Sequence, residues 1–245
     1  FRREPYLRAA FARPIMSTKT TKPEQEQADI DLGQAYSRAE LFLEKNKQAV
    51  TYGVVGLLVV VGALLGYRKL YAEPRAKEAN DLIWKAQYYF EIDSLDKAIN
   101  GDGNYFGFQY IADEYGNTPA GDLARFYLGT CYLQKGEYET AVSYYEEADV
   151  EDVVLKAMAA GGIGDAYVEL GRDQDAMKQF EKAASITTND FTTPMYLMKA
   201  GILYQQAGDW KKAAKAFRRV ANDFPTSPDA NTAKKYAARA ESMAG

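Results

Sequence analysis

The clearest pattern of apolar positions is an uninterrupted run over residues 49–67 (AVTYGVVGLLVVVGALLGY), which contains no charged side chain. Lys45 and Lys47 precede this run, and Arg68 and Lys69 follow it. At a rise of about 1.5 Å per residue, a helix of this length covers roughly 28 Å, close to the thickness of the hydrocarbon core of a bilayer. The pattern therefore predicts a transmembrane helix over residues 49–67.

Two further features of this run agree with a membrane helix. Tyr52, Tyr67 and Tyr71 lie near its ends, where aromatic residues gather at membrane interfaces. Gly62 and Gly66 are four residues apart, a spacing that predicts a face for packing against another membrane helix. A buried core helix and the apolar region of a signal peptide are the alternatives, which the length of the run and the lack of a small-residue cleavage pattern after it disfavour.

The segment before the run changes character twice. Residues 1–15 contain four Arg and one acidic residue, so an organelle presequence is an alternative for this leader, and Met16 is an alternative start. Residues 17–28 are polar and lack apolar periodicity, so we expect residues 1–28 to form a disordered flank. Residues 29–48 mix apolar and charged positions in a way that predicts an amphipathic juxtamembrane helix.

After the run, three segments repeat one pattern of small, aromatic and glycine positions, with starts 35 and 37 residues apart. The first segment is Leu128-Gly129-x-x-Tyr132-x-x-x-Gly136-x-x-x-x-Ala141-x-x-x-Tyr145, and the same residue types recur from Ile163 and from Ala200. The early Gly and the Ala allow two antiparallel helices to approach closely, and the aromatic residues fill the space between them. The mid-repeat Gly suits a left-handed turn that ends the first helix.

This pattern resembles the tetratricopeptide repeat family. A degenerate copy precedes the three segments (Trp84, Ala86, Tyr89 and Ala98), and residues 228–243 resemble the lone helix that caps a stacked array. The predicted fold class is thus all-α: one transmembrane helix followed by a helix-turn-helix solenoid of about four repeats with a C-terminal capping helix, over residues 68–243.

A short insertion interrupts the degenerate repeat. Residues 100–105 (NGDGNY) contain two Gly, which lowers helix propensity and predicts a loop. The segment lacks the frame of a calcium-binding EF-hand, so a loop without metal is the favoured interpretation.

In the tetratricopeptide family the first helix of each pair lines a concave groove, and the resemblance implies which residues do so in this chain. The predicted groove residues are Leu123, Phe126, Thr130, Leu133, Met158, Asp165, Val168, Met195, Met198, Ile202 and Gln205. Three of them are Met, whose flexible side chain suits a groove that accepts varied partners. Helical spacing alone does not separate groove from core, so packing between neighbouring helices remains the alternative.

Composition removes much of enzyme chemistry. The chain has no His, which excludes Ser-His-Asp and Cys-His nucleophile systems and His-based zinc sites. Its single Cys, Cys131, falls in a predicted first helix and is expected to be a small buried apolar residue. The net charge of −4 disfavours nucleic acid as a partner. We therefore expect a non-enzymatic protein with no cofactor, no metal and protein partners.

Charge is unevenly distributed along the repeats. Residues 137–175 contain eleven acidic and two basic residues, whereas residues 199–239 contain nine basic and three acidic residues. Such a separation can be a solvated face, or it can steer a partner or set the register of a homo-oligomer.

A membrane helix followed by such an array is similar in architecture to the bacterial YfgM-like family of single-pass inner-membrane proteins. That resemblance implies a periplasmic array that works beside the Sec translocon and the membrane-anchored chaperone PpiD, receiving or chaperoning exported proteins. The flanking charges taken alone favour the opposite orientation, since three basic residues precede the run and five follow it within about 20 residues. A scaffold for cell-envelope or division machinery, and an organelle-membrane receptor, are the alternatives.

Overall fold

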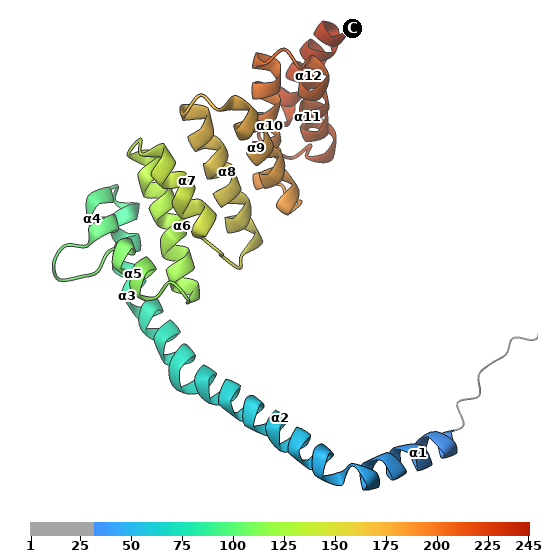
Figure 1. Cartoon of the computed structure of the whole chain (residues 1–245). Coiled ribbons are helices and arrows are strands. Elements are labelled where there is room, and N and C mark those ends of the chain that lie inside the picture. The colour runs from blue at the N-terminus through green and yellow to red at the C-terminus, as the bar shows by residue number, and fades with distance from the viewer. Residues whose placement is uncertain (1–31) are drawn as a thin grey trace, which may run out of the picture. The chain divides into compact units, whose positions relative to one another are not determined.

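The computed structural model describes residues 32–245, and every regular element in that range is a helix (Figure 1). The predictions for residues 1–28 lie outside the described residues. The chain divides after Val60, within α2, into two units. The helices are α1 (Leu32–Lys45), α2 (Lys47–Tyr67), α3 (Glu73–Glu91), α4 (Leu95–Asn100), α5 (Phe108–Glu114), α6 (Pro119–Gln134), α7 (Tyr138–Glu147), α8 (Val153–Glu169), α9 (Asp173–Ile186), α10 (Thr192–Gln206), α11 (Trp210–Asp223) and α12 (Ala230–Ala244).

Helix α2 is apolar and none of its residues is buried. Leu57 and Leu64, for example, are about two-thirds exposed. A five-residue π-helix, Arg68–Ala72, joins α2 to α3, so the backbone is helical from Lys47 to Glu91. In the described part of the chain, α2 has none of the burial that the core helix of a soluble protein would have. It is long and apolar enough to cross a membrane.

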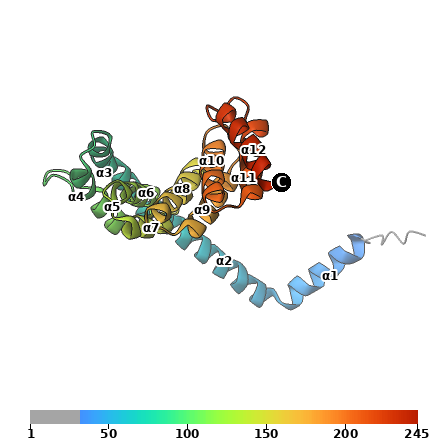
Figure 2. The ribbon, with the colours of Figure 1, turned by 90° about the horizontal axis from the view of Figure 1, so that it is seen from above.

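The later repeats are helical hairpins, in which α6 packs on α7, α8 on α9 and α10 on α11 (Figures 1 and 2). The same turn joins the two helices each time. Its glycines have positive φ, 79° at Gly136, 68° at Gly171 and 77° at Gly208. The next residue donates its N–H to the carbonyl of the repeat Tyr, at 2.9 Å for Asp209 and Tyr204. The mid-repeat glycines therefore end the first helices in a left-handed turn, as predicted.

A second glycine sets how closely the two helices of a hairpin approach. A Cβ added at Gly201 would lie 2.5 Å from the ring of Phe217 on α11, too close for any larger residue without movement of the helices. Gly129 meets Tyr145, and Gly164 meets Phe180, in the same way. The paired Gly and aromatic positions of the repeat pattern are thus direct contacts between the first and second helix.

The first repeat makes the same turn with an aspartate. Asp93 has φ 58°, and it is the only non-glycine residue with positive φ in the described part of the chain. Ser94 donates its N–H to the carbonyl of Tyr89 at 2.8 Å, which is the hydrogen bond that the three glycine turns make. The degenerate repeat therefore keeps the turn geometry although its sequence lacks the glycine.

The predicted insertion forms a loop between α4 and α5. Ala98 and Phe108 are ten residues apart, whereas the corresponding Ala and aromatic residue are four apart in the other repeats. The carboxylate of Asp102 organises the loop: it accepts hydrogen bonds from the hydroxyl of Tyr89 at 2.5 Å and from the backbone N–H groups of Asn104 and Tyr105 at 2.9 and 2.8 Å. The chain then re-enters the core at the fully buried Phe108.

The array ends with α12, which packs on α11 through Ala233, Ala237 and Ala240. Buried apolar residues form three clusters that follow one another along the repeats, from α3 to α6, from α6 to α8, and from α8 to α12. This succession is what a solenoid predicts, because each hairpin contacts its neighbours only.

Candidate partner-binding surface

Helix α6 carries four of the predicted groove residues, and they differ in exposure. Phe126 is buried, with 6 % of its surface exposed, and its ring meets that of Tyr145 edge-on with centroids 5.8 Å apart. Thr130 is half-buried and accepts a hydrogen bond from the hydroxyl of Tyr145 at 3.0 Å. Leu123 and Leu133 are half-buried and pack beside the same core cluster. Phe126 is therefore a core residue, and the other three reach the surface in part.

The apolar groove residues of α8 and α10 show the same mixture. Met158, Val168 and Met195 are half-buried against the core clusters. Met198 is buried, with 7 % of its surface exposed, whereas Ile202 is 37 % exposed. The flexible Met side chains thus serve packing as much as they serve a surface, and Ile202 offers the most accessible apolar contact among these five.

An ion pair joins the first helices of the last two hairpins. The ammonium group of Lys199 on α10 lies 2.6 and 2.7 Å from the two carboxylate oxygens of Asp165 on α8. Both side chains are about one-third exposed, so the pair is partly open to solvent. The half-buried Gln205 holds its side-chain oxygen without a hydrogen-bond partner in the described part of the chain. Polar groups therefore lie among the apolar residues of this face.

Two tyrosines close on α8 from its two sides. A Cβ at Gly162 would meet the ring of Tyr145, and a Cβ at Gly161 would meet the ring of Tyr196. Burial raises the pKa of Tyr145 to about 12, and burial together with the nearby Asp165 charge raises the pKa of Tyr196 further. Both phenols therefore stay neutral at physiological pH and act as packing and hydrogen-bonding groups.

Neither a metal-binding cluster nor an exposed cysteine is found among the described residues. No group of three or more Cys, Asp or Glu side chains that could hold a metal ion occurs between residues 32 and 245. Cys131 is buried, as predicted, and desolvation raises the pKa of its thiol to about 12, which keeps it unreactive. The surface can bind through shape, apolar contact and charge.

The structure also reveals an exposed group that the sequence analysis did not select. Lys85 lies 4.5 to 5.4 Å from the ring centroids of its four aromatic neighbours on α3 and the loop. The exposed aromatic cluster consists of Trp84, Tyr88, Tyr105, Phe106 and Tyr110. The signal was present in the sequence, because Tyr105 at the end of the insertion is followed directly by Phe106, and a solvent-exposed loop seldom needs two adjacent aromatic residues.

Gly62 and Gly66 lie on α2, and a Cβ added at either would meet no atom within 4 Å. Their surface is thus free of contacts with the described residues. Packing against another membrane helix stays a prediction, as does the binding role of the eleven groove residues.

Successive hairpins with a conserved turn geometry and a closing helix define the class of protein, an α-helical repeat solenoid. The particular repeat is the tetratricopeptide repeat: models of this family match residues 108–152, 159–190 and 196–227. The repeats within residues 108–227 are therefore tetratricopeptide repeats, as the sequence pattern predicts. Repeats of this kind are typically non-catalytic modules that bind other proteins. The models cover only the repeat motif, so the narrower resemblance to YfgM-like proteins stays a prediction.

Solved structures agree with the fold. The nearly identical TPR-like repeats assigned to a kinesin light chain of Podosopora anserina superpose with a TM-score of 0.52 at 15 % identity, over 69 % of this chain and 88 % of that chain. The MamA protein is similar at a TM-score of 0.47 and 17 % identity, over 69 % of this chain and 87 % of that one. The first of these likenesses, at 15 % identity, concerns the fold alone. No curated protein matches the chain.

Proposed function

We propose that this protein is a membrane-anchored module that binds a protein partner through the first helices of its repeats. The observation that carries the proposal is the direct passage from an apolar, unburied helix into a repeat array. An exposed apolar helix is costly in water and stable in a bilayer, while the repeats that follow it in the chain offer an extended surface for binding.

The finer part of the proposal rests on the resemblance to YfgM-like proteins. It places the chain in a bacterial inner membrane as a single-pass protein, with the array in the periplasm. There the array assists export, chaperoning or quality control of envelope proteins near the Sec translocon, with translocon components, a membrane-anchored chaperone or exported clients as partners.

A scaffold for envelope or division machinery is the second candidate, and one observation favours it. Phe126 and Met198 are buried, so the apolar surface left for a varied set of unfolded clients is small. A scaffold binds a fixed partner, for which the partly exposed Asp165–Lys199 pair and Ile202 supply a polar and an apolar contact.

In-cell photocrosslinking from Ile202 tests the proposal. We expect Ile202, replaced by a photoreactive residue, to capture proteins that mass spectrometry identifies. A matched control at Asn231, which is exposed on α12 and is not one of the predicted groove residues, should capture a different set. Translocon subunits, chaperones or exported proteins support the export function, and a constant set of envelope machinery supports the scaffold. Cytoplasmic proteins alone contradict the orientation and both functions.

Substitution separates binding from folding at the same site. We expect Met195→Glu with Ile202→Glu to reduce capture, because both side chains reach the surface and charge opposes an apolar contact. Met198 is unsuitable for this purpose, since a carboxylate at a buried position would destabilise the array itself. Unchanged yields of crosslinked partner in a folded double variant would contradict a role of this face.

A further inference from the structure

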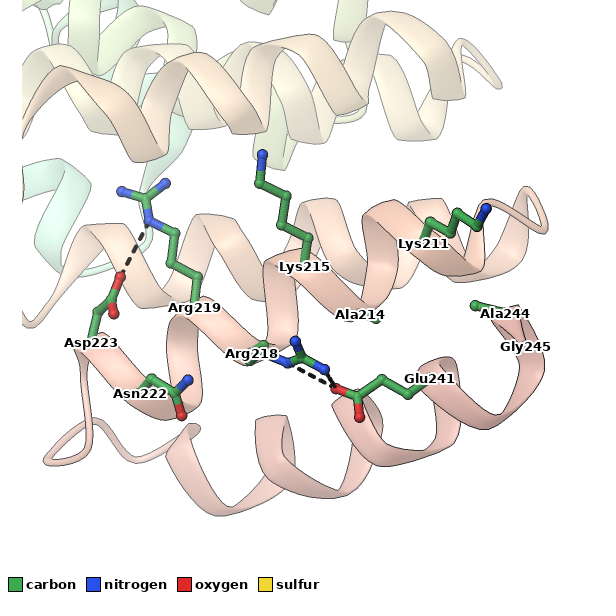
Figure 3. A pocket seen from close by; sticks show the side chains of 10 residues that line it. All are labelled: Lys211, Ala214, Lys215, Arg218, Arg219, Asn222, Asp223, Glu241, Ala244 and Gly245. Atoms are coloured by element: carbon green, nitrogen blue, oxygen red, sulfur yellow. Dashed lines mark hydrogen bonds and ion pairs between the residues drawn. The ribbon is translucent and has the colours of Figure 1, made fainter.

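A basic hollow lies between α11 and α12. Its residues belong to the second helix of the last hairpin and to the closing helix, whereas the face described above belongs to the first helices. In Figure 3, Lys211, Lys215, Arg218 and Arg219 extend from α11, and Glu241 on α12 faces Arg218. These side chains and Ala214 are among those that line the hollow. The cavity measures about 610 Å³ and is open to solvent. We refer to it as the basic hollow.

The positive charge of the basic hollow is only partly compensated within the chain. Arg218 pairs with Glu241 on α12, and Arg219 pairs with Asp223 at 3.6 Å (Figure 3). Lys211 and Lys215 make no ion pair with any described residue. The hollow therefore presents four basic side chains against two acidic side chains, and two of the basic side chains have no ion-pair partner within residues 32–245.

The opposite charge gathers two repeats earlier. We call residues 146–152 the acidic loop. They comprise the last two residues of α7 and the connection to α8, and they contain Glu146, Glu147, Asp149, Glu151 and Asp152. Asp149, Glu151 and Asp152 line a hollow of about 500 Å³ at the start of α8. Among the described residues, none forms an ion pair with Glu146, Asp149 or Glu151.

The acidic loop has a fixed shape. Val150 is buried and anchors its centre. The carboxylate of Asp152 accepts hydrogen bonds from the backbone N–H groups of Val154 and Leu155, at 2.8 and 2.9 Å, and so caps α8. A loop held in this way presents its exposed carboxylates without a large ordering cost when it binds.

None of the ion pairs within the described chain joins the acidic loop to the basic hollow, so each charged surface keeps its own excess. We infer that the acidic loop of one copy docks in the basic hollow of a second copy of this chain. The two surfaces are different patches, so the contact is heterologous and continues from copy to copy or closes into a ring. The complementary partner is present on every copy.

The contact is weak between free copies, because exposed ion pairs contribute little and are screened by salt. The inference therefore rests on the proposed membrane anchoring, which confines copies to one surface and raises their effective concentration. A lateral, salt-sensitive assembly follows, in which neighbouring arrays stand side by side.

Charge-reversal substitutions in the full chain test this contact. Copies labelled through Thr188→Cys with a donor or an acceptor dye are inserted into vesicles of neutral phosphatidylcholine, and energy transfer is measured. We expect transfer above the random-proximity level for the unmodified charges. Lys211→Glu with Lys215→Glu should abolish it, and so should Glu146→Lys with Glu151→Lys. All four side chains are exposed, so circular dichroism should show that the variants remain folded.

A mixture of the two charge-reversal variants tests whether the acidic loop and the basic hollow contact each other. The two variants carry complementary charge again when combined, so an equimolar mixture should restore the transfer that each lacks alone. Lys234→Glu with Lys235→Glu, a matched reversal on α12 outside the hollow, should leave the transfer unchanged. Salt of about 0.5 M should remove it, because the screening length falls well below 10 Å.

The opposing results are distinct. A mixture that fails to restore transfer contradicts the pairing of these two surfaces. If Lys211→Glu with Lys215→Glu abolishes energy transfer but Glu146→Lys with Glu151→Lys does not, the hollow binds another anion, such as an acidic peptide or a lipid headgroup. That result overturns the inference. A chain that does not sediment with vesicles contradicts the anchoring and the inference together, whereas a sedimenting chain without transfer contradicts the inference alone.

Discussion

The last hairpin and the first repeat follow one pattern but are held together differently. In the last hairpin Phe217 packs directly on Gly201, and α12 covers the outer side through small apolar residues. In the first repeat the residue four positions after the pattern Ala is Asp102, and the chain detours before Phe108 enters the core. The detour is fixed by hydrogen bonds to Asp102 and by aromatic rings around Lys85.

This comparison separates two ways of keeping a repeat in register. Apolar contact between helices stabilises the last hairpin in proportion to buried area and tolerates changes of pH and salt. Polar contacts around an exposed loop fix its geometry but contribute little to global stability, so the first repeat is the region that opens first. The following experiments test this difference, beginning with the largest expected effect.

Removing one aromatic ring from each region should give the largest difference in the free energy of unfolding. Phe217→Ala is expected to lower the free energy of unfolding by about 3–5 kcal/mol, because it leaves a cavity in a fully buried site. Phe106→Ala in the loop, where the ring is 46 % exposed, should change it by about 0.5 kcal/mol or less. Urea unfolding of the full chain in detergent, followed by fluorescence, measures both. Equal losses would show that the two regions do not differ in this way.

The turn residues of the two regions, Gly208 and Asp93, can each be replaced by the residue that the other turn uses. Gly208→Asp should destabilise the last hairpin by about 1 kcal/mol, because a side chain at positive φ is strained. Asp93→Gly should stabilise the first repeat by up to about 1 kcal/mol, because it relieves the same strain. Hydrogen exchange of the amides that flank each turn reports the local change. A loss of protection after Asp93→Gly would mean that the aspartate is preferred at this turn.

The exposed ion pair of the last hairpin should matter little. Arg218→Ala removes the partner of Glu241, and both side chains are more than one-third exposed. We expect a change of about 0.5 kcal/mol or less in the free energy of unfolding, since exposed pairs are screened by water and salt. Urea unfolding with Glu241→Ala and the double variant completes a cycle, and a coupling larger than about 1 kcal/mol would contradict this expectation.

The smallest global effect, confined to the loop, should come from pH. Hydrogen bonds from Tyr89 and from the loop backbone hold the pKa of Asp102 below its usual range. The contribution of Asp102 to the stability of the loop is complete above the usual Asp pKa of about 3.9 and is lost as pH falls through the lowered value. The bond to Asp102 raises the pKa of Tyr89 to about 12, so its contribution is complete below about pH 10 and is lost as pH rises through about 12.

Each region has one tryptophan to report this change. Trp84 lies beside the loop ring of Tyr105, and Trp210 begins α11. With Trp210→Phe the remaining fluorescence should change below about pH 4 and above about pH 10, whereas with Trp84→Phe it should stay constant until global unfolding. Parallel changes of both probes would show that the loop does not open separately, and Asp102→Asn should remove the acid change.

The sequence predicted the hairpins because their determinants are local. Gly201 and Gly208 are readable in the pattern, since one permits close approach and the other permits positive φ. Asp93 was not identified as a turn residue, because Asp adopts this backbone far less readily than Gly and carries no signal by itself. The anchoring of the loop by Asp102 depends on Tyr89, thirteen residues earlier, which no local pattern encodes.

The candidate surface was predicted less well for a related reason. Helical spacing places Met198 and Ile202 on the same side of α10, yet one is buried and the other exposed. Their difference arises from which neighbouring helices cover each position, and that depends on how the hairpins stack. The paired charges of Asp165 and Lys199 likewise come from helices 34 residues apart.

Gly161, Gly162 and Gly164, at the centre of α8, affect the order in which the helices of the array form. Each glycine lowers intrinsic helix propensity by about 1 kcal/mol, so this segment is a poor helix in isolation. The rings of Tyr145, Tyr196 and Phe180 close on it from three other helices. Helix α8 should therefore become helical only when its neighbours are in place, so we expect it to form late as the array folds.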